Sequence, residues 1–317
     1  MNAAVRLSAY AAALALIFGA AWGVGSAIGA PATTSASAPA TAPPPAAADP
    51  HAGGGPDSAG ARTAADGHAE PHPHGAAEVT SAGLAGTAAG YTLVPQLTTY
   101  LPGVPGEFAF TITGSDRRPV TAFDIEQERP LHLILVRRDT AGFQHLHPAL
   151  GPDGVWRLPI TLPAAGVYHV YADFTPTGGP ALVLGTDLFA PGNFAPIQFP
   201  QSRVAQVDGY QVRLDGELVP GAPSQVFATV SRDGTAVTDL EPYLGAFGHL
   251  VALRQSDLTY LHVHPDAAVP APTDRSGPGI AFTAEVPSAG TYRVFLDFRH
   301  RGTVRTAEFT VLTREAS

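Results

Sequence analysis

A histidine-bearing stretch occurs twice in the chain, at residues 130–148 and again at residues 247–265. In each copy a first histidine is followed thirteen residues later by a second (145 − 132 = 13 and 262 − 249 = 13), and then by a third two residues further on, just before a proline. Six histidines that repeat one spacing indicate a duplicated structural unit. They are His132, His145 and His147 in the first copy and His249, His262 and His264 in the second.

Each copy has the pattern of a β-hairpin. Segments 249–254 and 259–264 are rich in Leu, Val, Thr and Tyr, and the polar residues 255–258 connect them. Pairing residue 254 with 259 places His249 opposite His264, with His262 on the same face because side chains alternate along a strand. Opposed Cβ atoms are about 5 Å apart, so three imidazoles can converge on one ion. The first copy predicts the same arrangement, and a one-residue slip would abolish either one.

The repeat extends beyond the hairpins, since residues 163–174 match residues 287–298. Asp173 and Asp297 are the next-to-last residues of these blocks, and each is expected to serve the histidines of its own copy as a fourth ligand or as a hydrogen-bond partner that fixes an imidazole tautomer. A half-buried histidine bonded to an aspartate would explain the same pattern without a metal. His169 and His300 each occur in one copy only and are expected at surface strand ends.

The residue types that are missing narrow the choice of ion. The chain has no cysteine, and its single methionine is the initiator. Blue-copper centres need a thiolate and copper(I) carriers use soft sulfur ligands, so zinc or copper(II), held by nitrogen and oxygen, is the predicted cofactor. The chain also lacks lysine, carries a net charge of −9 and shows no basic stripe, which excludes nucleic acid as a partner.

Short β-prone runs separated by Gly, Pro, Asp and Asn follow one another from residue 91 onward, without helical periodicity. This pattern predicts an all-β fold of two tandem β-sandwich modules of the immunoglobulin or cupredoxin type, at residues 89–200 and 204–317. Residues 191–203 are the predicted linker between them.

Residues 1–88 show no pattern that predicts a hydrophobic core. An uncharged apolar run of 24 residues, 7–30, is long enough to span a bilayer, so a transmembrane helix that anchors the other domains outside the cell membrane is expected. A cleaved signal peptide and a secreted protein are the alternative. Residues 31–88 consist mainly of Ala, Pro, Gly, Ser and Thr and predict a disordered tether, in which His51, His68, His72 and His74 are incidental or collect metal loosely.

Residues 242–251, the Tyr-Leu-His-Val-His-Pro motif at 260–265 and the block at 289–298 resemble a set of uncharacterised bacterial extracytoplasmic proteins that are labelled heavy-metal-binding or copper-resistance-associated by similarity. The likeness covers about residues 91–312 and implies sandwich modules outside the membrane. No nucleophile elbow, phosphate loop or carboxylate pair is present. Non-catalytic binding of a divalent metal is therefore the expected function. The alternatives are a structural or protein-interaction module with structural histidines and, less favoured, a metal-dependent enzyme.

Overall fold

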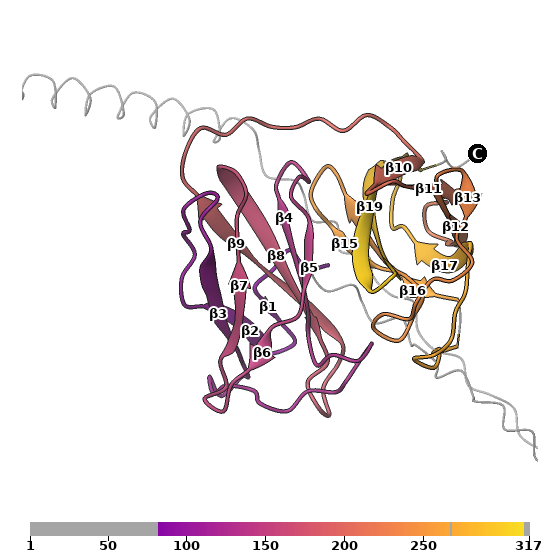
Figure 1. The fold of residues 1–317 in the computed structure, drawn as a ribbon. Helices are drawn as coiled ribbons and strands as arrows, with labels where there is room; N and C mark the ends of the chain where they lie inside the picture. The colour runs from indigo at the N-terminus through magenta and orange to yellow at the C-terminus, as the bar shows by residue number, and fades with distance from the viewer. Residues whose placement is uncertain (1–81, 267, 314–317) are drawn as a thin grey trace, which may run out of the picture. The chain divides into compact units, whose positions relative to one another are not determined.

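The computed structural model describes residues 82–266 and 268–313, and within these ranges every regular element is a β-strand (Figure 1). None of the described segments forms a helix that is long and apolar enough to cross a bilayer. The expected anchor at 1–30 lies outside the described residues, and so does most of the expected tether. Residues 82–88 were expected in the tether as well, but they contain strand β1 and contact the first module.

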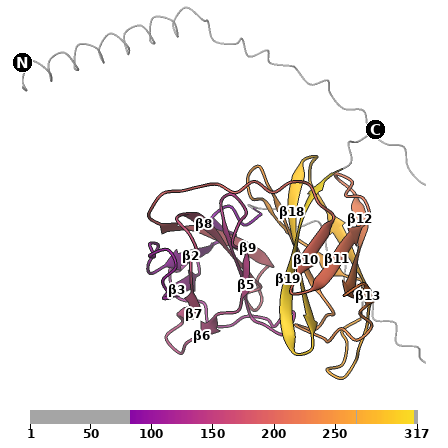
Figure 2. The same ribbon diagram turned by 45° about the horizontal axis from the view of Figure 1, so that its top comes forward.

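The first module is a sandwich of two antiparallel sheets, drawn in indigo to magenta in Figures 1 and 2. One sheet has the order β1-β2-β3-β7-β6, with strands Thr87–Ala88, Tyr91–Pro95, Gly106–Thr113, Trp156–Ile160 and Ala149–Leu150. The other has the order β5-β4-β8-β9, with strands Gln144–Leu146, His132–Arg137, Gly166–Phe174 and Leu182–Ala190.

The second module repeats this arrangement, drawn in orange to yellow. Its first sheet has the order β10-β11-β12-β17-β16, with strands Val204–Val207, Tyr210–Asp215, Pro223–Arg232, Gly279–Glu285 and His264–Pro265, and β13 (Thr235–Ala236) pairs with β12. Its second sheet has the order β15-β14-β18-β19, with strands Tyr260–His262, His249–Arg254, Thr291–His300 and Thr303–Leu312. The predicted all-β fold with two repeated modules is confirmed.

Burial patterns show which sheets are covered on both faces. Strands β11 and β12 alternate between buried and exposed residues, so one face meets the module core and the other meets solvent. Strand β4 is buried at all six positions and β14 at five of its six. The odd residues Leu133 and Leu135 of β4 belong to the core of the first module, whereas Ile134 belongs to a separate cluster that contains residues of both modules.

The predicted register of both hairpins is confirmed. Ile134 pairs with His145 and Val251 pairs with His262, which are the partners expected when opposite residue numbers sum to 279 and 513. The predicted strand ends are wrong, however. Strand β5 ends at Leu146, and His264 pairs with Thr283 in the other sheet instead of lying opposite His249.

The reason for this difference is that the His-X-His-Pro segment crosses between sheets in both copies. The chain leaves β5 or β15 at the first of these histidines or just after it, and continues as β6 or β16 at the edge of the facing sheet. The proline that follows the last histidine has no N–H to donate, which favours the end of a ladder at this position.

Candidate metal centre

The histidine-bearing faces of the two modules meet each other. A cluster of buried apolar side chains joins them, and Phe143 and Val183 pack against it. The members of this cluster are Ile134, Val136, Tyr171, Val251, Leu253, Leu258, Tyr260 and Phe295. The face that was predicted to carry two separate metal sites is therefore the interface between the modules.

Aromatic pairs in this interface follow the internal repeat. Phe143 stacks on Phe295, with ring centroids 4.0 Å apart and an interplanar angle of 6°. Tyr260 lies against Tyr171 at 5.2 Å. Phe143 and Tyr260 occupy matching positions in the two copies, and so do Phe295 and Tyr171, so the two contacts are related by the duplication. Aromatic pairs in general contribute about 0.5–1.5 kcal/mol beyond area burial.

The three histidines of the first module come together beside this cluster. His132 begins β4, His145 is the central residue of β5, and His147 follows β5. One ring nitrogen of each residue lies within 4.8 Å of the other two. The ring centroids are 4.9–5.4 Å apart. Three imidazole nitrogens in this arrangement form a set of potential metal ligands.

Fixed acceptors determine which ring nitrogens carry hydrogen. Nε2 of His132 lies 3.1 Å from the carbonyl oxygen of Glu126, which can only accept, so this nitrogen donates. Nδ1 of His145 lies 2.8 Å from Oδ2 of Asp297 and likewise donates. In the neutral rings the lone pairs are then on Nδ1 of His132 and Nε2 of His145, which face each other at 3.1 Å. These two nitrogens have no hydrogen to share while both rings are neutral.

The third ring adds another lone pair. Nε2 of His147 is buried and has no hydrogen-bond partner among the described residues. Burial lowers the pKa of His147 to about 3, and the neighbouring rings of His145 and His132 lower it further. Burial also lowers the pKa of His132 to about 4, against the bond to the Glu126 carbonyl, which raises it. Both rings are therefore neutral near pH 7, the state in which histidine binds a metal.

Two tight turns hold the acceptor carbonyls in place. Glu126 and Arg129 exchange two backbone hydrogen bonds of 2.9 Å, with positive φ at Gln127 (46°) and Glu128 (63°). A two-residue turn with positive φ at both central positions is typical of type I′, and each non-glycine residue in this conformation costs of the order of 1–3 kcal/mol.

The second module has the same turn between Tyr243 and Ala246, with Leu244 (φ 53°) and Gly245 (φ 73°) at its centre. The carbonyl oxygen of Tyr243 accepts a hydrogen bond of 2.6 Å from Nε2 of His249, as that of Glu126 accepts one from His132. Each copy thus positions its first histidine through the turn six residues upstream.

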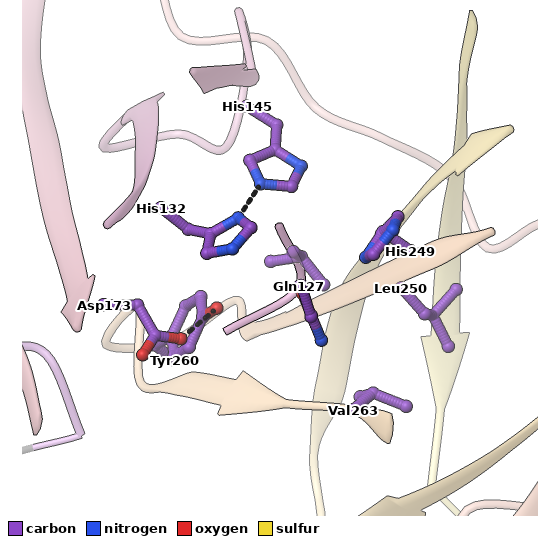
Figure 3. Close-up of a pocket in the computed structure, with 9 residues that line it drawn as sticks. Gln127, His132, His145, Asp173, His249, Leu250, Tyr260 and Val263 are labelled. Carbon is purple, nitrogen blue, oxygen red and sulfur yellow. Dashed lines mark hydrogen bonds between the residues drawn. The ribbon is translucent and has the colours of Figure 1, made fainter. Parts of the chain in front are cut away.

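A cavity of about 20 Å³ lies beside the first histidine set, between residues of both modules (Figure 3). His132 and Asp173 line it from the first module, and His249 and Tyr260 from the second. One water needs about 10–15 Å³ by this measure, so the cavity has room for a single water or a single ion.

The remaining expected ligands do not all fall as the sequence predicted. Asp297 was assigned to the histidines of its own module, but it bonds to His145 of the other module. Asp173 lies opposite His132 in the sheet, and its Oδ2 accepts a 3.1 Å bond from the hydroxyl of Tyr260 in the second module. The ring of His249 is 6.2 Å from that of His145. The side chains of His262 and His264 lie outside what the structure describes.

Several residues near the site were not found from the sequence. Glu126 acts through its carbonyl, which no side-chain pattern reveals, and Tyr260 was expected only as a residue of the second strand of its hairpin. Thr306 donates a 2.6 Å hydrogen bond to Oδ1 of Asp297, and it lies on β19 directly opposite that residue. Pairing of the last two strands of the repeat would have indicated Thr306.

His169 and His300 are buried, with 2 % and 3 % exposure, so their expected placement at the surface is wrong. His169 bonds to Asp187 at 2.6 Å and to the carbonyl of Gly83 at 2.8 Å, and so links residues 82–86 to the first module. His300 lies between the Tyr210 hydroxyl and Asp239. These histidines fill their hydrogen-bonding capacity within the protein and lie outside the candidate centre.

Comparison with known proteins matches residues 86–184 and 205–315 to a family model described as "Domain of unknown function (DUF8832)". The two matched segments coincide with the two modules. No curated protein matches the chain.

Three similar solved structures have low TM-scores. A DUF4426 family protein from Pseudomonas aeruginosa PAO1 is 9 % identical, with a TM-score of 0.28, and the match covers 37 % of this chain and 100 % of that one. The Yersinia pseudotuberculosis adhesin InvE is 9 % identical, with 70 % and 58 % covered and a TM-score of 0.21. The Escherichia coli adhesin FdeC is 16 % identical, with 73 % and 66 % covered and a TM-score of 0.23. Similarities with TM-scores this low support no conclusion about the function of this chain.

Proposed function

The chain belongs to the family described as a domain of unknown function (DUF8832), and we propose that it binds a divalent metal ion, zinc or copper(II), through His132, His145 and His147. The binding is non-catalytic and serves buffering, sensing or delivery of the metal. The proposal includes a second site in the second module, formed by His249, His262 and His264.

One observation carries this proposal. The acceptors of His132 and His145 leave two lone pairs opposed at 3.1 Å, and Nε2 of His147 adds a buried nitrogen without a hydrogen-bond partner among the described residues. A proton can join two of these nitrogens, but only a cation with several coordination positions can meet all three. Buried polar atoms are normally satisfied, so an unsatisfied group beside opposed lone pairs indicates a ligand.

The dimensions suit a small cation. Zinc binds imidazole nitrogen at about 2.0–2.1 Å, which places tetrahedral ligand nitrogens about 3.3 Å apart. The His132–His145 pair, at 3.1 Å, is already close to this spacing. The third nitrogen, within 4.8 Å, requires an approach of at most about 1.5 Å, which a side-chain rotation supplies. Asp297 behind His145 forms the carboxylate–histidine arrangement that is common behind metal ligands.

The proposed location is outside the cell membrane. The 24-residue apolar run at 7–30 would anchor the protein, and the segment up to the first module would act as a tether for two sandwiches of the immunoglobulin or cupredoxin type. The resemblance to extracytoplasmic proteins labelled heavy-metal-binding supports the same location.

His147 gives the sharpest test, because a structural role and a metal role predict different results for it. Its Nε2 has no hydrogen-bond partner among the described residues, so His147→Ala leaves no partner of that atom unsatisfied. If His147 has a purely structural role, the substitution should change stability and metal binding little. If His147 is a metal ligand, the variant should bind one ion fewer.

The experiment uses the full chain in a mild detergent, with the four tether histidines changed to alanine so that they bind no metal. Zinc and copper(II) are titrated by calorimetry into this background, into His147→Ala, and into the control His300→Gln, whose ring bonds to Asp239 away from the site. Elemental analysis of the protein purified with its metals gives the stoichiometry. We expect binding that His147→Ala reduces by one ion and His300→Gln preserves. If neither ion binds the protein that carries only the four tether substitutions more tightly than millimolar, the proposal is wrong.

One observation favours the alternative, in which the histidines are architectural. The bond between His145 and Asp297 joins the two modules, and both side chains are only 6 % exposed. In that case the protein is a structural or protein-interaction module. His145→Ala would then lower stability by about 1–3 kcal/mol through the orphaned carboxylate, and no metal would bind.

A further inference from the structure

We propose that metal binding by the first module is regulated by docking of the second, with Asp297 as the positioning residue that links the two. This inference rests on the proposed function and adds a mechanism of control to that same site.

Asp297 belongs to the second module, yet its carboxylate determines the state of a ligand in the first. Thr306 on the neighbouring strand holds Oδ1 at 2.6 Å, and the side chain is almost fully buried. Oδ2 reaches across the interface to Nδ1 of His145 at 2.8 Å. This bond keeps hydrogen on Nδ1 and directs the Nε2 lone pair toward His132. When the modules separate, His145 loses the partner that fixes its tautomer and ring orientation.

The same short segment carries the docking contact and the ligand. Phe143 lies two residues before His145 and stacks on Phe295, which lies two residues before Asp297. On strand β18, Phe295 and Asp297 share a face because residues i and i+2 point the same way, and Phe143 directly precedes strand β5, which carries His145. Docking that brings the two rings together also brings Asp297 onto His145.

Linkage between the two processes is reciprocal. If docking raises the affinity for metal by a given factor, bound metal favours the docked arrangement by the same factor. The apparent Kd equals the intrinsic Kd divided by the fraction of docked molecules, so a variant that is half undocked has about twice the apparent Kd.

The first experiment measures zinc affinity at the site that His147→Ala removes, again in the full chain without tether histidines. Asp297→Asn should weaken zinc binding by about 10–100-fold, the usual effect of removing the partner behind a metal ligand. Asp239→Asn is the matched control, because it alters a histidine–aspartate pair in the same module that does not contact the site. Urea midpoints are measured on the same samples, since a merely structural role would move the midpoint and leave the affinity unchanged.

Thr306→Val gives a second variant if Asp297→Asn does not fold. It removes only the hydroxyl that holds Oδ1, so it should weaken zinc binding in the same direction but by less. Unchanged affinity in a folded Asp297 or Thr306 variant overturns the inference.

The second experiment observes docking directly. The chain contains no cysteine, so Glu107→Cys and Gln211→Cys place one spin label on an exposed position of each module. Phe143→Ala removes the stacked pair without changing a histidine or an aspartate. We expect it to broaden the distance distribution without zinc, to raise the zinc Kd, and to regain a narrow distribution at saturating zinc.

The outcomes separate this inference from the proposed function. If the protein that carries only the four tether substitutions binds neither zinc nor copper(II), the proposed function and this inference are both wrong. Tight binding that Asp297→Asn and Phe143→Ala leave unchanged refutes the coupling alone. Weaker binding in both variants, with Asp239→Asn unaffected, supports it.

Discussion

Acidification from pH 7.5 to 5 should release the metal from the first site far less than an ordinary histidine site would allow. A metal competes with protons for each ring nitrogen, so a ring that stays neutral at pH 5 adds little competition. Burial and the neighbouring rings lower the pKa of His132 to about 4 and that of His147 to about 3. Both values lie below pH 5, so both rings remain mostly neutral across the whole range.

The size of the effect follows from these values. A ring with the model-peptide pKa of about 6.5 weakens binding at pH 5 by about 30-fold, and two such rings by about 1000-fold. With a pKa of about 4, the corresponding factor for His132 is only about 1.1, and for His147 it is closer still to one. His132 and His147 should then release almost no proton when metal binds between pH 7 and 5.

Calorimetric zinc titrations at pH 7.5, 6.5, 5.5 and 5.0, in pairs of buffers with different ionisation enthalpies, measure both the affinity and the number of protons released per ion. The protein is the full chain without tether histidines, and His147→Ala identifies the site. At most one proton per zinc is expected at pH 6. Release of two or more protons per zinc would refute the argument that burial keeps these rings neutral. So would a loss of zinc affinity between pH 7.5 and 5 that is about 1000-fold larger than competition with a single proton explains.

Two further predictions concern the metal-free protein and the amino terminus. His132 is a base whose folded pKa is lowered, so its contribution to stability is full above about pH 6.5 and is lost as the pH falls toward 4. Between pH 7.5 and 5 His132 should account for about 2 kcal/mol of the fall in the free energy of unfolding, measured by urea denaturation. In His132→Gln the fall should be smaller by this amount but still present, because the lowered pKa of His147 makes a separate contribution. The native protein should stay with membranes after alkaline washing and keep Trp22 in its mature mass, whereas secreted protein beginning near residue 31–33 would contradict the anchor.

The register of the histidine hairpins could be predicted from the sequence because it depends on local facts. The polar connection fixes which residues pair, and alternation then fixes which side chains share a face. Thus Ile134 was placed opposite His145 without any knowledge of the sandwich. The strand ends could not be predicted in the same way, because the crossing to the other sheet after Leu146 depends on where that sheet lies.

The partner of His145 could not be read from the duplication. The repeat suggested that each aspartate serves its own copy, whereas Asp297 serves the other one. A signal for this was present in the apolar runs of β4 and β14, where both faces are hydrophobic instead of alternating. A strand that is apolar on both faces predicts cover on both, but it does not say which surface provides the second cover.

The duplication itself explains why the two histidine faces meet. When two equivalent faces pack against each other, each contact occurs twice with the roles of the copies exchanged, as in the isologous interface of a two-fold dimer. The pairs Phe143–Phe295 and Tyr260–Tyr171 are such a repeated contact. Residues near the axis of such an interface come close to residues of the other copy, which accounts for the 6.2 Å between the rings of His145 and His249. Tandem duplication of a module with one histidine-bearing face is therefore sufficient to bring histidine and aspartate side chains of both copies together at one place, and a later change in either copy alters the surroundings of both.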